Sequence, residues 1–301
     1  MTTGNRAPVK ETRRWRHPAP PSQSHPTSRW VRSARHTARR RGSPPVVVAR
    51  HTVTTSTSDY QLILVAGERI GRRGLSEAIS DAVAELRAID VTYSPLRRNS
   101  LVSLLRRGEV SAEVYPPLAD IVGRCEAMRT ATDGWFDPWA VPGGFDPAGM
   151  IKGWAIERAA SRLRAAGICD YAVVSGGDLT VRGHAPHGGP WRIALRQSSS
   201  AASGGTRTTI VTMVDGAIGT SGMTNRRGPV IDPRTGAAVH RAGAAMVLGA
   251  DLAIADGYAT ALYAAGTAGH AWFPTVDGYR PLGLVDVDSA PSAAGRLVDP
   301  D

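Results

Sequence analysis

The chain has 301 residues, which is enough for one large domain or two small ones, and its formal net charge is +10. Residues 1–50 contain 12 of the 36 basic residues and a single acidic residue, whereas the other 251 residues carry a net charge of −1. The basic character therefore belongs to one end of the chain, and the rest gives no electrostatic reason to expect a nucleic-acid partner. No apolar stretch is long enough for a membrane-spanning helix, and no basic segment is followed by the apolar run of a secretory signal.

The sequence divides into a tail, a domain and a second tail. Residues 1–52 are rich in arginine and proline and lack a periodic apolar pattern, so we expect them to be disordered. They form either a dispensable extension or a basic arm for nucleic acid or an anionic membrane. We expect one folded domain over residues 53–290 and a C-terminal tail over 291–301. The two cysteines, Cys125 and Cys169, are too few for a disulfide framework, which favours buried free thiols and a cytoplasmic location.

The first half of the expected domain is mainly helical. A strand is expected over residues 61–66, and apolar residues at helical spacing predict a long helix over 75–89. A turn at 93–95 separates it from further helices, which are expected around residues 101–105, 115–130 and 152–166. Gly167 stands where the cap of the last of these helices is expected.

The second half changes to the pattern of strands. Strands are expected over residues 171–174, 179–182, 191–196, 208–214 and 244–248. A flexible surface loop is expected over 198–205, and an alanine-rich helix over 253–265. Because regular strand–helix–strand repeats are missing, the sequence predicts an α+β fold rather than a doubly wound α/β sheet.

Polar clusters that contain glycine stand out at the expected ends of these elements. They are residues 133–137, 146–153, 176–178, the pair 219–222 and 231–236, and 255–260. Lys152 is the only lysine after residue 50 and stands where a helix is expected to begin, an arrangement that can bind phosphate. The alternative is a solvated lysine in a first helical turn. Gly176-Gly177-Asp178 either lets a ligand approach the backbone closely or forms a plain hairpin turn.

Asp256 and Thr260 are four residues apart on an expected helix, so their oxygens project from the same face. A carboxylate and a hydroxyl without histidine or cysteine suit a hard cation such as Mg²⁺. The alternative is that Thr260 bonds to its own helix backbone and Asp256 caps the helix.

Taken in order, these clusters resemble the FAD:protein FMN transferase family, also called the ApbE family, over about residues 86–285. The motifs that carry the resemblance are Gly134-Trp-Phe-Asp137, Asp146-Pro-Ala-Gly-Met-Ile-Lys-Gly153, Ser175-Gly-Gly-Asp178, Thr220-Ser-Gly222, Ile231-Asp-Pro-Arg-Thr-Gly236 and Ala255-Asp256 to Thr260. The resemblance implies an ApbE-like single domain, with mixed helices and antiparallel-rich sheets. It also implies a compact cytoplasmic enzyme that uses Mg²⁺ to move FMN from FAD to a Thr or Ser hydroxyl of a target protein, with release of AMP.

The resemblance also assigns roles to residues. The metal ligands it implies are Asp256, Thr260 and the backbone carbonyl of Gly149. The flavin nucleotide contacts it implies are Phe136, Asp137, Asp146, Lys152, Gly177, Asp178 and Val230. Asp256 and Lys152 are the candidates for a direct part in catalysis, since a metal ligand and an ammonium group both neutralise charge on a transferring phosphoryl group.

The chain departs from the family at a position that matters. The family usually carries a histidine three residues before the Asp of the Asp-Pro-x-Thr-Gly motif, where this chain has Pro229. Proline has no titratable group and cannot act as the base. Another histidine, such as His184 or His240, could replace it. The alternatives to a transferase are therefore a degenerate homologue that binds FAD and Mg²⁺ or hydrolyses FAD slowly, and a nucleic-acid-binding protein that uses the basic tail.

Overall fold

The computed structural model describes most of the chain. The described residues are 29–31, 46–67, 70–198, 206–222, 228–241, 243–273, 278–283 and 294–297. The helices are α1 (Gly71–Tyr93), α2 (Leu101–Arg106), η1 (Ala112–Val114), α3 (Pro116–Ala131), α4 (Ala148–Ala165), α5 (Leu252–Ala265) and η2 (Gly266–Ala271). The strands are β1 (Arg29–Val31), β2 (Val46–Thr54), β3 (Asp59–Gly67), β4 (Asp170–Ser175), β5 (Asp178–Arg182), β6 (Trp191–Ser198), β7 (Thr206–Met213), β8 (Gly216–Gly222), β9 (Ala244–Gly249), β10 (Arg280–Gly283) and β11 (Ala294–Leu297).

Two antiparallel sheets organise these elements. The larger sheet has the strand order β1-β2-β3-β4-β5-β8-β9-β10, and the smaller has the order β11-β6-β7. Every pairing between neighbouring strands of the described chain is antiparallel. The prediction of an α+β fold with antiparallel-rich sheets is therefore confirmed.

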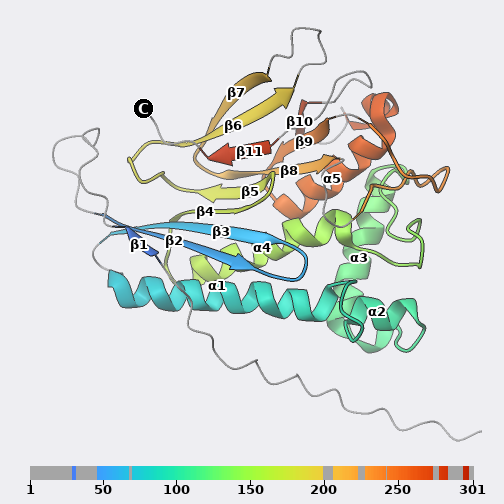
Figure 1. The fold of residues 1–301 in the computed structure, drawn as a ribbon, viewed down its shortest axis with the longest axis horizontal. Coiled ribbons are helices and arrows are strands. Elements are labelled where there is room, and N and C mark those ends of the chain that lie inside the picture. The colour runs from blue at the N-terminus through green and yellow to red at the C-terminus, as the bar shows by residue number, and fades with distance from the viewer. Residues whose placement is uncertain are drawn as a thin grey trace, which may run out of the picture.

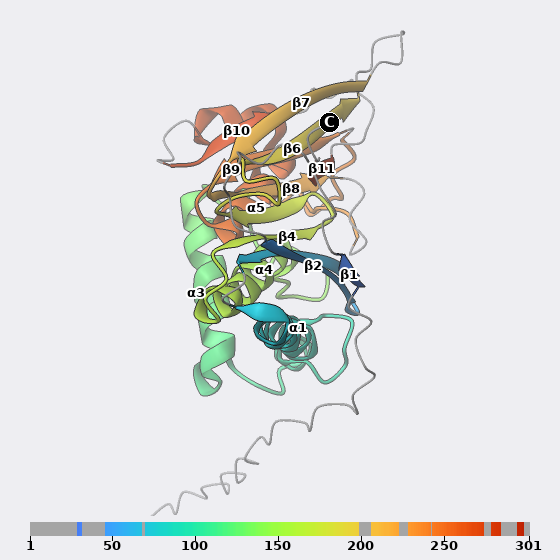
Figure 2. The same ribbon diagram turned by 90° about the vertical axis from the view of Figure 1, so that its left-hand side faces the viewer.

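The larger sheet lies between a helical layer and the smaller sheet (Figures 1 and 2). Alternation along β3 explains this, because Leu62 and Leu64 belong to the core shared with the helices, whereas Val65 belongs to the core shared with β6. On β4, Tyr171 and Ala172 divide between the two cores in the same way. The sheet is thus apolar on both faces and needs a layer on each side.

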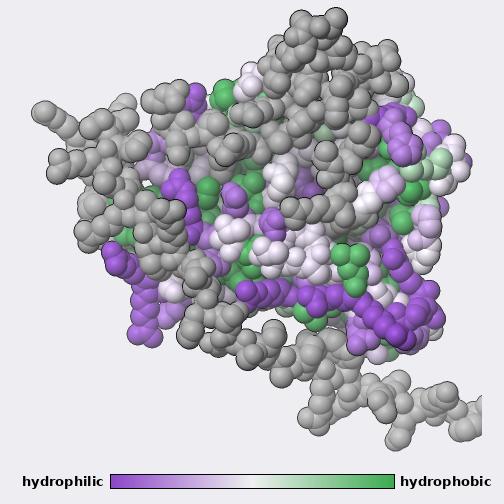
Figure 3. Space-filling view, viewed as in Figure 1, coloured by the Kyte–Doolittle hydropathy of each residue, from purple (hydrophilic) through white to green (hydrophobic). Residues whose placement is uncertain are grey.

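Helix α1 is longer than its periodic pattern predicted. Leu75, Ile79, Val83 and Leu86 form its buried stripe, as expected from their spacing, and the helix extends beyond them in both directions. It ends at Tyr93 because the next residues turn the chain before a proline. Along this helix, at the lower edge of Figure 3, hydrophilic side chains predominate on the described surface.

Three described strands extend into the segments expected as tails. Strand β2 begins at Val46 and pairs with β3 along its whole length, so the expected start at residue 53 falls inside a strand. The expected tails also contribute strands, since β1 pairs with β2 and β11 pairs with β6. The rest of the expected basic tail, residues 1–28 and 32–45, lies outside the described residues. Residues 199–205, which make up most of the expected surface loop, also lie outside the described residues.

Strand β8 was not expected. Its glycines obscure the alternation of a strand, and the sequence indicated only a glycine-bounded polar segment there. Gly219 is required by packing, since a β-carbon at that position would lie 2.4 Å from the backbone of Ala255. Helix α5 therefore packs directly on the backbone of β8, and this places Asp256 beside the sheet.

The described residues include both cysteines. Cys125 is buried and free, and burial raises the pKa of its thiol well above the ordinary value. Cys169 is also free but exposed, so the expectation of a buried thiol is wrong there. Among the described helices, none has the length and apolar character needed to cross a membrane.

Candidate active site

Helices α4 and α5 cross at a glycine and meet at a buried carboxylate. A β-carbon on Gly153 would lie 2.5 Å from the backbone oxygen of Leu252, so only glycine permits this separation. The N–H of Gly153 donates to Oδ2 of Asp256 at 3.0 Å, and the Asp256 side chain is buried. The crossing therefore holds a carboxylate in a fixed place between two helices.

One helical turn further along, the same two helices meet again. Thr260 Oγ1 donates to the backbone oxygen of Gly149 at 3.2 Å and lies 3.4 Å from Oγ of Ser221 on β8. A β-carbon on Gly149 would touch the ring of Phe136 and the side chain of Thr260. Thr260 thus bonds across to α4 and not to its own helix. The cap of α5 is Asp251, whose side chain accepts from Ile254, so Asp256 is not needed as a cap.

Two of the expected metal ligands, Thr260 and the Gly149 carbonyl, are in contact, and Asp256 lies one turn before Thr260 on α5. Asp256, Thr260 and the carbonyl of Gly149 supply a carboxylate, a hydroxyl and a backbone oxygen from two packed helices. This all-oxygen set suits Mg²⁺, which is usually held by one or two carboxylates with the rest of its shell from water and phosphate. No cluster of three or more His, Cys, Asp or Glu residues occurs in the described part of the chain. The residues present fit Mg²⁺ better than they fit zinc.

Lys152 reaches from α4 to the start of β5. Its Nζ lies 2.5 Å from Oδ2 of Asp178, whose side chain is fully buried. The N–H of Thr220 donates to Asp178 Oδ1 at 2.6 Å, and Thr220 Oγ1 donates to the oxygen of Gly177 at 2.9 Å. The ammonium is thus fixed by a carboxylate that β8 holds in place. This is a buried ion pair with additional hydrogen bonds, a geometry that can offset the cost of desolvation.

One expectation about this region is wrong, namely the start of the helix. Helix α4 begins at Ala148, so Lys152 lies in its second turn and not at its first residue. The expected contact of Lys152 with phosphate stays a prediction. Gly176 and Gly177 form the turn of the β4–β5 hairpin, as in the plainer interpretation, and Asp178 begins the second strand.

Asp137 and Asp146 both hold local turns and both face arginine. Asp137 accepts from the N–H of Trp139 at 2.8 Å and pairs with Arg129 at 3.2 Å. Asp146 accepts from the N–H of Ala148 at 2.9 Å and pairs with Arg106 at 2.9 Å. These carboxylates thus organise the segment that leads into α4.

The arginines were missed by the sequence analysis. Arg106 ends α2 and Arg129 lies near the end of α3, and both stand in ordinary helical surroundings. Nothing in their local sequence distinguishes them from the other arginines of the chain. Arg106 also donates from Nε to the backbone oxygen of Phe145 at 2.8 Å, which ties α2 to the segment before α4.

Residues 228–241, here called the arm, fold back on themselves beside this segment. Ile231 and Ala238 form an antiparallel bridge, and the N–H of Val239 donates to the oxygen of Val230 at 2.7 Å. At the tip, the guanidinium of Arg234 lies 4.0 Å from the ring centre of Trp135, a cation–π contact. Val230 packs against the main core, so the arm rests on the domain at its tip and its base.

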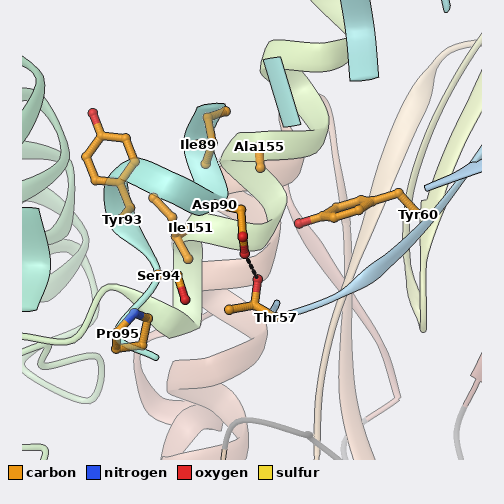
Figure 4. Close-up of a pocket in the computed structure, with 9 residues that line it drawn as sticks. All are labelled: Thr57, Tyr60, Ile89, Asp90, Tyr93, Ser94, Pro95, Ile151 and Ala155. Atoms are coloured by element: carbon orange, nitrogen blue, oxygen red, sulfur yellow. Dashed lines mark hydrogen bonds between the residues drawn. The ribbon is translucent and has the colours of Figure 1, made fainter. Parts of the chain in front are cut away.

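A small pocket lies at the C-terminal end of α1, in a region where the sequence gave no signal for a site. Figure 4 shows Asp90 pointing toward Thr57, whose hydroxyl donates to Asp90 Oδ1 at 3.1 Å. Ser56 donates to the same oxygen at 2.7 Å, and Arg97 pairs with Oδ2 at 2.8 Å. The cavity volume is about 20 Å³, which is room for one water molecule.

The Asp90 network sets the charge of that carboxyl. Burial by itself raises the pKa of Asp90, but the hydrogen bonds from Ser56 and Arg97 outweigh it and hold the pKa below its ordinary value. Asp90 is therefore a buried, charged anchor between α1 and the β2–β3 turn.

The comparisons with known proteins agree with one another. The family model described as ApbE family matches residues 140–278. A curated relative, FAD:protein FMN transferase from Vibrio cholerae serotype O1, is 33% identical over 225 residues, which are 68% of this chain. The matched region spans 61% of that relative's length.

Solved structures share the fold. The flavin transferase ApbE from Vibrio cholerae matches with a TM-score of 0.69 and 20% identity, covering 84% of this chain and 97% of that one. The apo flavinyl transferase ApbE from Pseudomonas stutzeri matches with a TM-score of 0.65 and 19% identity, covering 84% and 94%. The expected resemblance to the ApbE family is therefore confirmed by the family model over residues 140–278 and by the curated relative.

Proposed function

We propose that the chain is a Mg²⁺-dependent FAD:protein FMN transferase, which moves FMN from FAD to a Thr or Ser hydroxyl of a target protein and releases AMP. The observation that carries the proposal is the convergence of Asp256, Thr260 and the Gly149 carbonyl beside Lys152. The name of the curated relative supports the same activity. We propose a cytoplasmic location and a protein acceptor, and nucleic acid is the less favoured partner.

In this proposal Asp256, Thr260 and Gly149 hold Mg²⁺, which neutralises charge on the pyrophosphate when bound. Lys152 offers a second positive charge one turn from these ligands on α4. Asp178 fixes the direction of that ammonium, because β8 holds the carboxylate through Thr220.

The segment before α4 supplies the proposed nucleotide contacts. Phe136 lies against Gly149, and Asp137 and Asp146 are held by arginines, so this segment is ordered before FAD arrives. Such ordering reduces the entropy lost on binding. Gly177 and Val230 complete the proposed contacts from the β4–β5 turn and the arm.

One observation favours the second candidate, a homologue that binds FAD and Mg²⁺ or hydrolyses FAD without transfer. Pro229 is exposed at the start of the arm and offers no proton acceptor. The two candidates differ in the chemical step only, since both need the same binding residues.

The test separates binding from transfer. The full-length protein is incubated with FAD, Mg²⁺ and a peptide library that presents one Thr or Ser in varied contexts. Covalent flavin fluorescence on a denaturing gel together with AMP release supports the transferase. FAD binding with AMP and free FMN supports hydrolysis, and FAD binding without AMP contradicts both catalytic candidates. A protein that does not bind FAD contradicts the proposal entirely.

A further inference from the structure

The register of the arm brings a histidine opposite Pro229. The bridge between Ile231 and Ala238 fixes the pairing, and the flanking bonds from Val239 to Val230 and from Asp232 to Ala237 follow the same register. Continuing that register by two residues sets His240 across from Pro229. Residues directly opposite in an antiparallel pair have β-carbons about 4.5–5.5 Å apart on the same face.

Burial in the arm agrees with this alternation. Val239, on the other face, is buried in the main core, whereas Pro229 and His240 are both exposed. The imidazole therefore leaves the arm on the face that the side chain of residue 229 occupies. It is accessible to a protein acceptor that approaches from solvent.

Contacts at both ends of the arm hold it against the elements that carry the proposed site residues. At the tip, Arg234 stacks on Trp135, which is next in sequence to Phe136, the residue that lies against Gly149. At the base, the Tyr263 hydroxyl donates to the backbone oxygen of Arg241 at 2.6 Å. Tyr263 follows Thr260 by three residues on α5, so the residue next to His240 is tied to the helix that carries the proposed metal ligands.

His184 does not share this position. It lies beyond Arg182, at the opposite end of β5 from Asp178, and its Nδ1 is 3.7 Å from Asp170. At about 3.3 Å per residue, β5 separates it from Asp178 by roughly 15 Å. Of the two histidines that the sequence singled out, only His240 lies on the arm.

We propose that His240 is the general base of this chain, a role that rests on the proposed function. The acceptor hydroxyl oxygen bonds to the phosphorus of the FMN half of FAD, and its proton passes to an imidazole nitrogen of His240. The bond from that phosphorus to the bridging oxygen breaks, and AMP leaves with the electron pair. The same transfer with water as acceptor yields FMN and AMP.

The test moves the imidazole across the arm. AMP release from FAD is measured with water and with the peptide library as acceptors, for the wild type, His240→Gln, and the double variant His240→Gln with Pro229→His. General base catalysis contributes about 10²–10⁴-fold, so His240→Gln is expected to lose at least about 100-fold. The double variant is expected to recover about tenfold or more, because Pro229→His returns an imidazole to the same face.

Three controls keep the result specific. Calorimetric affinity for FAD in Mg²⁺ should change less than about twofold in His240→Gln, because a base lost from the chemical step leaves ground-state binding intact. His184→Gln should release AMP at the wild-type rate. Added imidazole should partly restore a His240→Ala variant, which a structural role would not allow.

The outcomes separate the two proposals. Wild-type AMP release by His240→Gln overturns the assignment of the base and leaves the transferase intact. Loss of FAD affinity in parallel with activity also overturns it, since His240 would then act in binding. A wild type that binds FAD but releases no AMP overturns the proposed function and the base with it.

Discussion

Two regions of the molecule hold the proposed functional groups in different ways: the wall, formed by α4, α5, β5 and β8, and the arm of residues 228–241. The wall is closed by glycines and holds its charges without exposure: Asp178 is fully buried and Asp256 nearly so. The arm is largely exposed and is held by its own turn, by one cation–π contact and by a few contacts at its base. The proposed binding groups are therefore fixed by close packing, whereas the proposed proton acceptor lies on an exposed segment with few contacts to the rest of the domain.

The largest effect should come from filling the helix crossing. Gly153→Ala puts a methyl group 2.5 Å from the oxygen of Leu252, so α4 and α5 must separate. We expect the free energy of unfolding to fall by about 3 kcal/mol in urea denaturation, at the upper end for overpacking. The matched control is Gly123→Ala on α3, where a β-carbon meets nothing within 4 Å, and a small gain is expected. Equal effects of the two substitutions would show that the crossing is not tight.

The second largest effect on stability is expected at the buried ion pair between Lys152 and Asp178. Asp178→Asn keeps an acceptor for the N–H of Thr220 but leaves Lys152 without its carboxylate. We expect a loss of about 2 kcal/mol, below the usual cost of a broken buried pair because Lys152 can turn toward solvent. Asp120→Asn, which removes the half-exposed partner of Arg124, serves as control and should leave the denaturation midpoint unchanged. A neutral Asp178→Asn would refute the view that β8 fixes the ammonium.

The Asp90 network lies between the wall and the arm in exposure. It therefore tests whether burial determines how much a charged group contributes to the free energy of unfolding. Its folded pKa is held below the ordinary value, so its stabilising effect is full above about pH 4, near the unfolded pKa. That effect is lost as the pH falls through the folded pKa. We expect Asp90→Asn to cost about 1 kcal/mol at pH 7, in line with a charged hydrogen bond that is partly screened. Wild type and variant should converge in acid, and a constant gap between their stabilities would contradict this.

The smallest effect is expected in the arm. Arg234→Ala removes the contact with Trp135, which is worth about 0.5–1 kcal/mol at a partly exposed site, and an exposed ion pair with Asp133, which adds little. The amide hydrogens of Val239 and Gly236, which donate within the arm, should exchange faster while those of α5 do not. Arg234→Lys retains a cation and should show a weaker change. Unaltered exchange in Arg234→Ala would mean that other contacts hold the arm.

The helices of the wall could be predicted from local sequence, but the contacts between its elements could not. Helical spacing identified α1 and α5 and put Asp256 and Thr260 on one face, which the structure confirms. The pairing of Lys152 with Asp178 was not predictable, because it depends on how α4 crosses β5. Nor was strand β8, since its glycines serve the packing of α5 and erase the alternation that marks a strand.

The arm shows the same limit in another form. Residues 231–236 stood out in the sequence only as a polar cluster with glycine, and the structure forms a turn there through bonds to Asp232. The position of His240 opposite Pro229 follows only from the register of the bridge. The sequence offered both His184 and His240 as replacements for the missing histidine, and only the register distinguishes between them.

The most direct test of the account is the Mg²⁺ dependence of FAD cleavage by the full-length protein and by Asp256→Asn. The asparagine keeps an acceptor for the N–H of Gly153 and removes the charge that would hold the cation. We predict that the wild type releases AMP from FAD only with Mg²⁺, and that Asp256→Asn requires at least about tenfold more Mg²⁺ for half-maximal release, as expected when a charged ligand is lost. AMP release that is independent of Mg²⁺, or the same Mg²⁺ requirement in both proteins, would contradict the assignment of this site.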